Sequence, residues 1–150
     1  MSKSSAFENS LLLLLFNNTA IANVGDASGI PAAATAGNLF IRLYTSAIAV
    51  DDDTIGTECA YTGYVSFGVA VPRSGAGWTV STNNASNAAA ITFGACTAGS
   101  ETVRYFAIWK TNVDGTAANR IYWGQLTSDL AVSSGITPEF AIGALDVNED

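Results

Sequence analysis

Short segments of alternating apolar residues, separated by turn-forming residues, run from residue 38 to the end of this 150-residue chain. In the first of them, Leu39, Ile41 and Leu43 fall on one face of an extended strand. Many short strands at near-even spacing predict a mainly β fold, an antiparallel β-sandwich or barrel of jelly-roll type. The expected strands cover residues 39–44, 64–71, 78–82, 89–93, 102–110, 120–127 and 139–147.

Turn-forming residues divide these segments and indicate which strands pair. The strongest hairpin joins Thr102–Lys110 to Arg120–Thr127 around Asp114-Gly115, although its loop is longer than a two-residue turn. The other turn signals are Pro72-Arg73-Ser74-Gly75, Asn83-Asn84 and Thr97-Ala98-Gly99-Ser100. Because no internal repeat is evident and the length suits one domain, we expect a single β domain over residues 38–150.

The first 24 residues have a different pattern, which predicts a helix over Ser4–Val24. Ser4 or Ser5 can cap it, and Glu8 follows Ser5 in capping-box spacing. Its apolar stripe is wide, so we expect cover on more than one side. The sequence leaves open whether this helix packs on its own domain or acts as an arm on a neighbouring subunit. The candidate interface residues are Phe7, Leu11, Leu12, Leu14, Leu15 and Phe16.

The small residues of Gly25–Gly37, with Pro31, predict a flexible or extended connector between the arm at residues 1–24 and the β domain. The apolar run Leu11–Phe16 is much shorter than a membrane-spanning segment, which needs about 18 apolar residues. Glu8 and Asn17 border this run, which argues against a cleaved signal peptide.

The chain carries few charges, and most of them are acidic. Charged residues make up 13% of the sequence, against about 25% in a typical soluble domain, and the mean hydropathy is +0.28. A surface this poor in charge favours extensive contact with other protein; a monomer with a Ser/Thr/Asn surface is the alternative. The net charge of −7 and the dispersed Lys and Arg residues argue against nucleic acid and anionic membrane partners.

No catalytic or cofactor site is predicted. The chain has no His, and no nucleophile, phosphate-binding or metal-ligand motif stands at the required spacing. Cys59 and Cys96 are expected to be buried free thiols, with one disulfide as the alternative. The acidic run Asp51–Asp53, with Glu58 nearby, is predicted to be a solvated turn rather than a calcium loop. We therefore predict no enzyme activity, no metal and no cofactor.

The aromatic residues allow two interpretations. In strands they belong more often to a core or a subunit interface than to a carbohydrate-stacking surface, so glycan binding is the minority hypothesis. The residues concerned are Trp78, Trp109, Trp123, Tyr61, Tyr64, Tyr105 and Tyr122.

An ordered set of segments along nearly the whole chain resembles a family of small virion proteins of tailed bacteriophages, often labelled tail-fibre-like. The segments are Phe7-Glu8-Asn9-Ser10-Leu11-Leu12 with Leu15-Phe16, Leu39-Phe40-Ile41-Arg42-Leu43-Tyr44-Thr45, Tyr61-Thr62-Gly63-Tyr64, Val69-Ala70-Val71 and Arg73-Ser74, Gly77-Trp78-Thr79-Val80, Ala90-Ile91-Thr92-Phe93, Tyr122-Trp123-Gly124-Gln125-Leu126-Thr127 and Gly135-Ile136-Thr137-Pro138-Glu139-Phe140.

The resemblance implies a virion component, assembled in the bacterial host cytoplasm, and carries no active site. Its position in the particle is left open. The compact, repeat-free layout favours a capsid cement or decoration protein that stabilises the shell. Its expected partners are the major capsid protein and copies of itself, in a homo-oligomer such as a trimer. The alternative is a tail fibre or glycan-binding receptor module.

Overall fold

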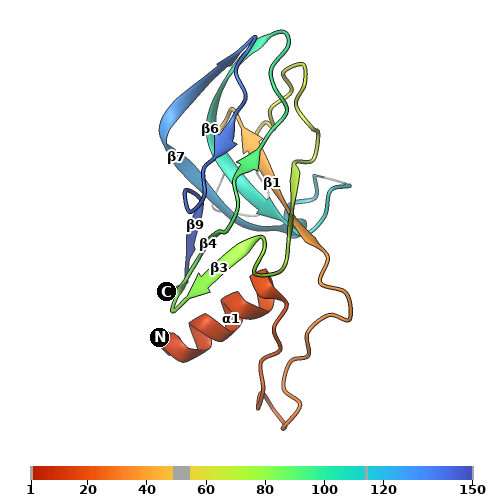
Figure 1. Ribbon diagram of the computed structural model, residues 1–150, viewed down its shortest axis with the longest axis vertical. Coiled ribbons are helices and arrows are strands. Elements are labelled where there is room, and N and C mark those ends of the chain that lie inside the picture. The colour runs from red at the N-terminus through yellow and green to blue at the C-terminus, as the bar shows by residue number, and fades with distance from the viewer. Residues whose placement is uncertain (1, 49–54, 114, 150) are drawn as a thin grey trace. The chain divides into compact units, whose positions relative to one another are not determined.

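The computed structural model describes residues 2–48, 55–113 and 115–149 (Figure 1). It confirms a mainly β fold with antiparallel sheets and an N-terminal helix. The described sheets have four, three and two strands and none closes into a barrel, so the barrel alternative is wrong. The elements are α1 (Ser5–Asn17), β1 (Asn38–Tyr44), β2 (Val69–Pro72), β3 (Trp78–Ser81), β4 (Asn84–Asn87), β5 (Ile91–Thr92), β6 (Ser100–Trp109), the 3-10 helix η1 (Ala117–Asn119), β7 (Arg120–Ser133), β8 (Glu139–Phe140) and β9 (Asp146–Asn148).

The chain forms two compact units, each built from segments that are distant in sequence. The helix unit contains Met1–Asn38, Pro72–Ile91 and Phe140–Asp150, and the sheet unit contains Leu39–Val71 and Thr92–Glu139. The expected division into an arm at 1–24, a connector at 25–37 and a β domain at 38–150 follows the chain order. The two units of the structure do not follow the chain order, because the helix unit combines the N-terminal helix α1 with the C-terminal strand β9.

The sheet unit is organised around the hairpin that the sequence predicts. Its four-stranded sheet has the order β2-β1-β6-β7, and β6 pairs antiparallel with both β1 and β7. Ile41 and Ile108 stand opposite each other in the centre and are fully buried. A bulge interrupts β7, since the register passes from Val103↔Leu130 to Tyr105↔Gln125. Bulges of this kind bend a strand and interrupt its regular pairing.

The helix unit consists of α1 packed against β3 and β4 of a three-stranded sheet with the order β3-β4-β9 (Figure 1). The helix ends at Asn17, not at Val24 as expected. Asn18 takes the left-handed conformation, with φ at 52°, and its backbone N–H bonds Leu13 O. Asn tolerates this conformation better than most residues, so it ends helices well. The predicted Ser5–Glu8 capping box is not formed, because Ser4 is the N-cap.

Three strand predictions were wrong in their bounds. The expected strand 64–71 is only β2 at its C-terminal end, and the expected strand 89–93 is only β5. In the helix unit β4, with the sequence Asn-Ala-Ser-Asn, was not expected. Its intrinsic β propensity is low, but Ala85 and Asn87 are buried in the unit. The expected strand 139–147 is divided into β8 and β9, with a turn at residues 142–143 between them.

Candidate assembly surface

The apolar residues of α1 lie on two sides of the helix. Leu12 and Phe16 are fully buried against the unit's own sheet, and the Phe16 ring centroid lies 4.5 Å from that of Trp78. Glu8, one turn before Leu12, is also buried. Two of the six predicted interface residues, Leu12 and Phe16, therefore belong to the core of the helix unit.

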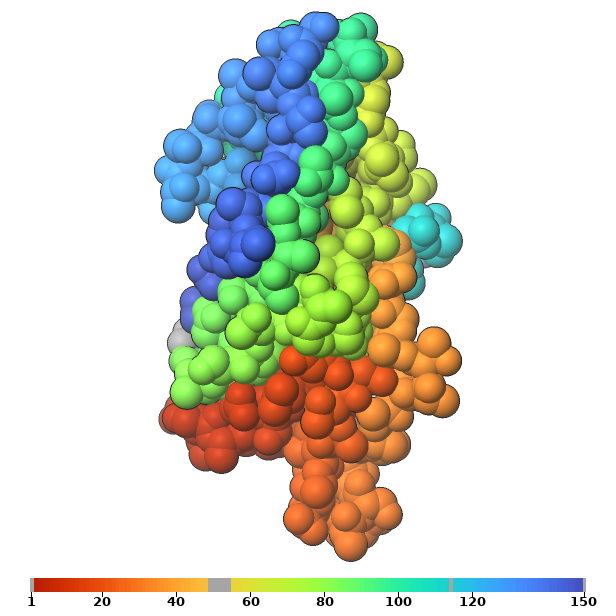
Figure 2. Space-filling view, viewed as in Figure 1, coloured from red at the N-terminus to blue at the C-terminus, as the bar shows by residue number. Residues whose placement is uncertain are grey.

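The other four predicted interface residues remain accessible. Phe7 is 38% exposed, whereas Leu11, Leu14 and Leu15 are half-buried. Phe7, Leu11 and Leu14 follow one another at spacings of four and three residues, so they share one side of the helix, away from Leu12. We call these three residues the outer stripe. In the space-filling view the helix, in red, has an open surface on the face shown (Figure 2).

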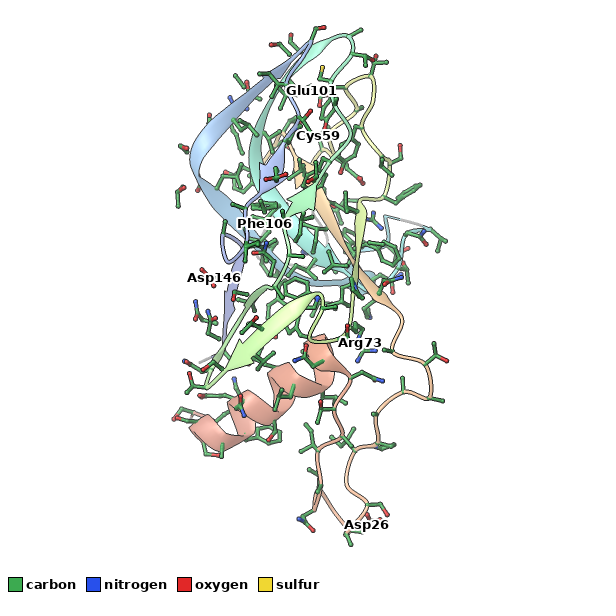
Figure 3. All side chains as sticks on the ribbon, in the orientation of Figure 1. Asp26, Cys59, Arg73, Glu101, Phe106 and Asp146 are labelled. Carbon is green, nitrogen blue, oxygen red and sulfur yellow. The ribbon has the colours of Figure 1, made fainter. Side chains whose placement is uncertain are left out.

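Arg73 fixes the C-terminal end of α1. Its Nε donates to Leu15 O and its Nη2 to Leu14 O, both at 2.7 Å, and its Nη1 donates to Ala36 O at 3.1 Å. Figure 3 shows Arg73 beside this end of the helix. The last carbonyls of a helix lack hydrogen-bond partners within the helix and carry partial negative charge. A guanidinium stabilises them both by donating hydrogen bonds and by its positive charge. Arg73 thereby holds the outer stripe in a fixed orientation.

Residues 19–37 form a hairpin-like extension of the helix unit, and from here on we call this extension the arm, in place of the arm expected at residues 1–24. Ile21 and Ile30 exchange two backbone hydrogen bonds of 2.9 and 2.8 Å. Asn18 bonds both the N–H and the carbonyl of Ala33 through its side chain. Asp26 lies at the tip (Figure 3), where its Oδ1 accepts from the N–H of Ser28 and of Gly29. The predicted connector thus has a defined hydrogen-bonded shape.

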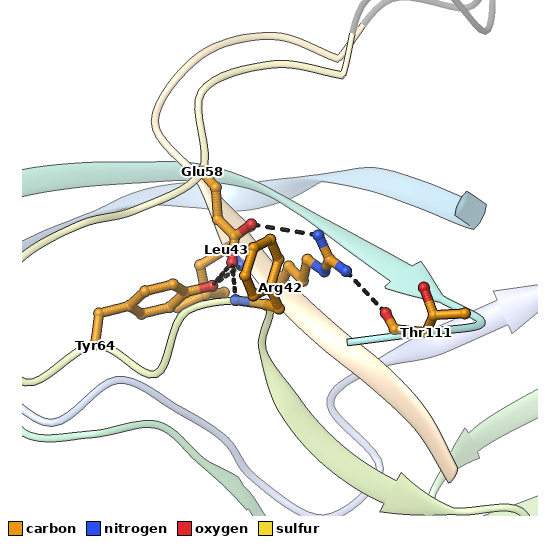
Figure 4. Close-up of polar contacts among 6 residues, drawn as sticks. Arg42, Leu43, Glu58, Tyr64 and Thr111 are labelled. Atoms are coloured by element: carbon orange, nitrogen blue, oxygen red, sulfur yellow. Dashed lines mark hydrogen bonds and ion pairs between the residues drawn. The ribbon is translucent and has the colours of Figure 1, made fainter. Parts of the chain in front are cut away.

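A buried arginine is the main charged feature of the sheet unit (Figure 4). Arg42 is 1% exposed; its guanidinium carbon lies 4.0 Å from the Trp109 ring centroid and 5.0 Å from that of Phe67. Its Nη2 donates to Thr111 O at 2.8 Å, and its Nη1 lies 3.5 Å from Glu58 Oε2. Aromatic faces attract a cation strongly where water is excluded.

Glu58 connects this arginine to a neighbouring loop. Its Oε1 accepts from Tyr64 OH at 3.0 Å and from the N–H of Phe67 at 2.9 Å. Burial, and secondarily the Glu58 charge, raises the pKa of Tyr64 far above its ordinary value. Tyr64 OH in turn accepts from the N–H of Leu43. The expectation of a solvated acidic turn is wrong for Glu58, and Asp51–Asp53 lie outside the described residues.

The arrangement around Arg42 fixes the fold and does not present reacting groups. Its charges are directed at each other and at ring faces, and Phe67 is held at a φ of 65°. A bulky residue rarely adopts this conformation, which costs roughly 1–2 kcal/mol. The contact of Phe67 with Arg42 and its bond to Glu58 offset that cost. The cluster therefore acts as an internal clamp of the sheet unit.

The remaining candidate groups also have structural surroundings. Cys59 and Cys96 are buried free thiols, as predicted. Burial, with Glu101 as the second cause, raises the pKa of Cys59 to about 12, so the thiol stays protonated and unreactive at neutral pH. Across residues 2–48, 55–113 and 115–149, no three acidic or Cys side chains gather as metal ligands. In the same part of the chain, no helix is long and apolar enough to cross a membrane.

The aromatic residues divide as the majority interpretation predicts. Trp78, Trp109 and Tyr61 are buried in the units' interiors. Tyr64 is partly buried and stacks on Phe93 with ring centroids 6.3 Å apart. The minority glycan-binding hypothesis thus loses three of its seven proposed residues to the interior, while Tyr64, Tyr105, Tyr122 and Trp123 are half-buried. The importance of Arg42 and Arg73 was missed, since both look like ordinary surface arginines in the sequence; the apolar neighbours of Arg42 in its strand were the one available signal.

The comparison with known protein families decides the identity of the chain. A family described as podophage GP4 fiber I protein gp80 matches residues 2–148. The chain belongs to this family. The fiber I family is one of phage virion structural proteins, so the expected resemblance is confirmed and the chain is a virion component. No curated protein matches it.

The fiber I match spans residues 2–148 and so covers segments of both units. It includes α1 with its outer stripe, the arm and the clamp around Arg42. Because both units belong to the matched sequence, the outer stripe is part of a fiber I chain and not an added segment. The virion assignment rests on this family.

Proposed function

We propose that this chain is a structural subunit of a podophage fibre and that it acts through protein–protein contacts rather than catalysis. The observation that carries the proposal is the match of residues 2–148 to a family described as a fiber I protein. The structure is consistent with it, because the buried arginine and Arg73 are engaged in internal contacts and Phe7 of α1 stays exposed on the surface of the helix unit.

A capsid cement protein is the second candidate. The feature that favours it is the layout of the chain, which has 150 residues in two small units and no repeat. In that role the partners are the major capsid protein and further copies of the chain. Stabilisation then comes from apolar burial at about 25 cal/mol per Å² in contacts repeated over the shell.

Particles that lack the chain separate the two roles. A fibre subunit predicts particles that retain their DNA on heating and fail to adsorb to host cells. A cement protein predicts the reverse, with normal adsorption and DNA loss at lower temperature. Density for the chain in images of intact virions gives an independent answer, because a fibre and a shell surface are distinct positions. Chain density absent from the virion would contradict both roles.

The non-catalytic part of the proposal has its own test. Purified protein is incubated with polysaccharides and cell-wall material of the host, and product release is measured. We expect no turnover, because the chain has no His and its buried thiol is protonated. Turnover that disappears on a single substitution in this chain would show an enzyme.

A further inference from the structure

We propose that the turn Val65–Gly68 of the sheet unit is a contact site for a different virion protein, whose apolar surface covers Val65 and Phe67. We call this segment the Phe67 turn. The inference rests on the proposed role as a structural subunit, and it names one surface and the chemistry of its partner.

The Phe67 turn places an aromatic residue where the backbone favours glycine. The N–H of Gly68 bonds Val65 O at 3.0 Å, so the four residues form a β-turn with Phe67 in its third position. Phe67 has a φ of 65° there. A positive φ at the third position is typical of type II turns, which take Gly or Asn because a larger side chain crowds the backbone. A residue held in such a conformation points to a functional role for its side chain.

Internal contacts hold the turn in one shape. Gly63 and Gly68 flank it and are packed so closely that an added Cβ would collide with backbone carbonyl oxygens of neighbouring segments. Glu58 Oε1 accepts from the Tyr64 hydroxyl at 3.0 Å (Figure 4) and from the N–H of Phe67 at 2.9 Å. A loop that is fixed before binding loses little conformational freedom when a partner binds, which favours the contact.

The outer side of the turn is apolar. Val65 is 52% exposed and Phe67 is 37% exposed, with the exposed Ser66 between them. The Arg42 guanidinium carbon lies 5.0 Å from the centroid of the Phe67 ring and covers it from within the unit. The internal contacts therefore explain how the turn is held, and they leave Val65 and part of the Phe67 ring accessible to a partner.

The polar groups around the turn favour a protein partner over a glycan. The hydroxyl groups of a sugar lose hydrogen bonds to water on binding unless the site replaces them. The carboxylate of Glu58 is already occupied by the Tyr64 hydroxyl and the N–H of Phe67. Ser66 is the polar side chain that the turn itself exposes. An apolar protein surface needs no such replacement and gains from burying Val65 and Phe67.

Charge disfavours two other partners. Residues 61–68 contain no charged residue, so the turn has no group that attracts an anionic lipid headgroup. The net charge of −7 repels both an anionic membrane and a second copy of the chain. A different virion protein with an apolar surface therefore fits the turn best.

Thiol labelling tests whether the turn is covered in the particle. Val65→Cys and Val113→Cys are made separately, and Val113 is the matched control because it is a 71% exposed valine of the same unit. Both thiols should react with a maleimide in the purified chain. In intact virions Val65→Cys should lose this reaction and Val113→Cys should keep it. The unsubstituted chain gives the background of the buried Cys59 and Cys96. Equal reaction or equal protection at the two positions in virions would overturn the inference.

A charge substitution tests whether the contact depends on apolar character. Val65→Asp, with Val113→Asp as the control, is supplied to phage that lack the wild-type gene, and copies of the chain per particle are counted by quantitative mass spectrometry. We expect about tenfold fewer copies for Val65→Asp, because a carboxylate would be buried in an apolar contact, and normal copies for the control. Both purified variants should keep the urea midpoint of the wild type, since both side chains are exposed.

Normal copy number for Val65→Asp would overturn the inference. If that normal copy number is combined with failed adsorption, the turn contacts the host cell instead. Self-association of the purified wild type that Val65→Asp abolishes would also overturn it, because a second copy would then occupy the turn. In each of these cases the wild-type chain is present in virions and the proposed structural role stands. If the wild-type chain is absent from purified virions, the structural role itself fails.

Discussion

The helix unit and the sheet unit stabilise their interiors with different polar contacts. In the helix unit, the buried Asn87 donates to the carbonyls of Ala89 and Ala141 at 2.8 Å and accepts from the N–H of Leu145 at 2.9 Å. In the sheet unit, the buried Arg42 faces the carboxylate of Glu58 and two rings. The buried polar side chain of the helix unit therefore bonds to backbone atoms, whereas that of the sheet unit pairs with a carboxylate.

This difference follows from how each unit is assembled. The helix unit brings together three separate chain segments, and side chains such as Asn87 and Arg73 join them by bonding the backbone of another segment. The sheet unit has a long hairpin whose backbone ladder already joins its strands. Its buried charges lie beside that ladder and fix the loops around it. We therefore expect the sheet unit to respond to charge and pH, and the helix unit to loss of its side-chain bonds to the backbone.

The largest expected effect is that of Glu58→Ala in the sheet unit. The substitution leaves Arg42 as a buried charge without its carboxylate and removes the acceptor for Tyr64 OH and for the N–H of Phe67. Leaving a buried charge without its partner costs about 3–5 kcal/mol, and because the Glu58 side chain is 22% exposed we expect the lower end of that range. Urea denaturation should show this loss in the free energy of unfolding. Glu139→Ala, at an exposed carboxylate that accepts from Thr92, is the matched control and should cost below about 1 kcal/mol.

If Glu58→Ala and Glu139→Ala cost the same, the clamp contributes nothing and the contrast between the units fails. Glu58→Gln gives a finer result, because it keeps an acceptor oxygen and removes the charge. We expect an intermediate loss, since the bonds from Tyr64 and Phe67 can persist while the attraction to Arg42 is lost.

The second expected effect is that of Arg73→Ala in the helix unit. It removes the donors to Leu14 O, Leu15 O and Ala36 O, and it exposes the end of α1 to fraying. Hydrogen bonds from charged groups contribute about 1.5–3 kcal/mol, so we expect a loss of roughly 2–3 kcal/mol and a weaker helical signal in circular dichroism. The measurement is the 222 nm ellipticity during urea denaturation.

Arg104→Ala is the matched control for Arg73, because Arg104 pairs with Asp129 on the surface of the sheet unit. Their side chains are 45% and 52% exposed, and such pairs contribute below about 1 kcal/mol. A loss at Arg104 as large as at Arg73 would mean that bonding to helix carbonyls gives no special stability.

The sequence predicted the sheet unit better than the helix unit, for a physical reason. The β6–β7 hairpin joins neighbouring segments and shows itself in alternation and turn residues, which act locally. The bulge at residues 126–129 leaves no comparable pattern. In the helix unit, β4 becomes a strand because β3 and β9 pair on either side of it, although its own residues disfavour one.

The candidate site was predicted in part for a related reason. Helical periodicity selected six of the apolar residues of α1 as one wide stripe, whereas in the structure these six lie on two sides of the helix. Which side packs on the chain's own sheet depends on Trp78, about 60 positions away, and on Arg73. Periodicity carries no information about such distant contacts.

The third expected effect is alkaline destabilisation confined to the sheet unit, which contains every Cys and Tyr residue of the chain. Burial first, and then Glu101, raises the pKa of Cys59 from 9.0 to about 12. Below pH 9 the thiol is protonated in both states, so its contribution to stability is intact. Between pH 9 and 12 the unfolded chain binds fewer protons than the folded chain, so stability falls by up to about 1.4 kcal/mol per pH unit.

Tyr44 and Tyr61 add to this fall, because burial raises the pKa of each from 10.0 to about 12. Cys59→Ala should therefore make the decline between pH 9 and 12 shallower without abolishing it. Urea denaturation at a series of pH values measures the slope. An unchanged slope in Cys59→Ala would mean that this thiol titrates alike in the folded and unfolded chains.

The smallest expected effect is that of Ser4→Ala at the N-terminus of α1. Ser4 Oγ accepts from the N–H of Phe7 at a long 3.4 Å, in an exposed position where water competes. The loss should be about 0.5–1 kcal/mol, below that of Arg73→Ala at the other end of the same helix. Ser10→Ala is the control, since Ser10 Oγ bonds only Ala6 O within the helix and caps no free N–H. If Ser4→Ala lowers the free energy of unfolding as much as Arg73→Ala does, the N-terminal end of α1 is stabilised as strongly as its C-terminal end. The outer stripe would then owe its orientation to the helix itself rather than to Arg73.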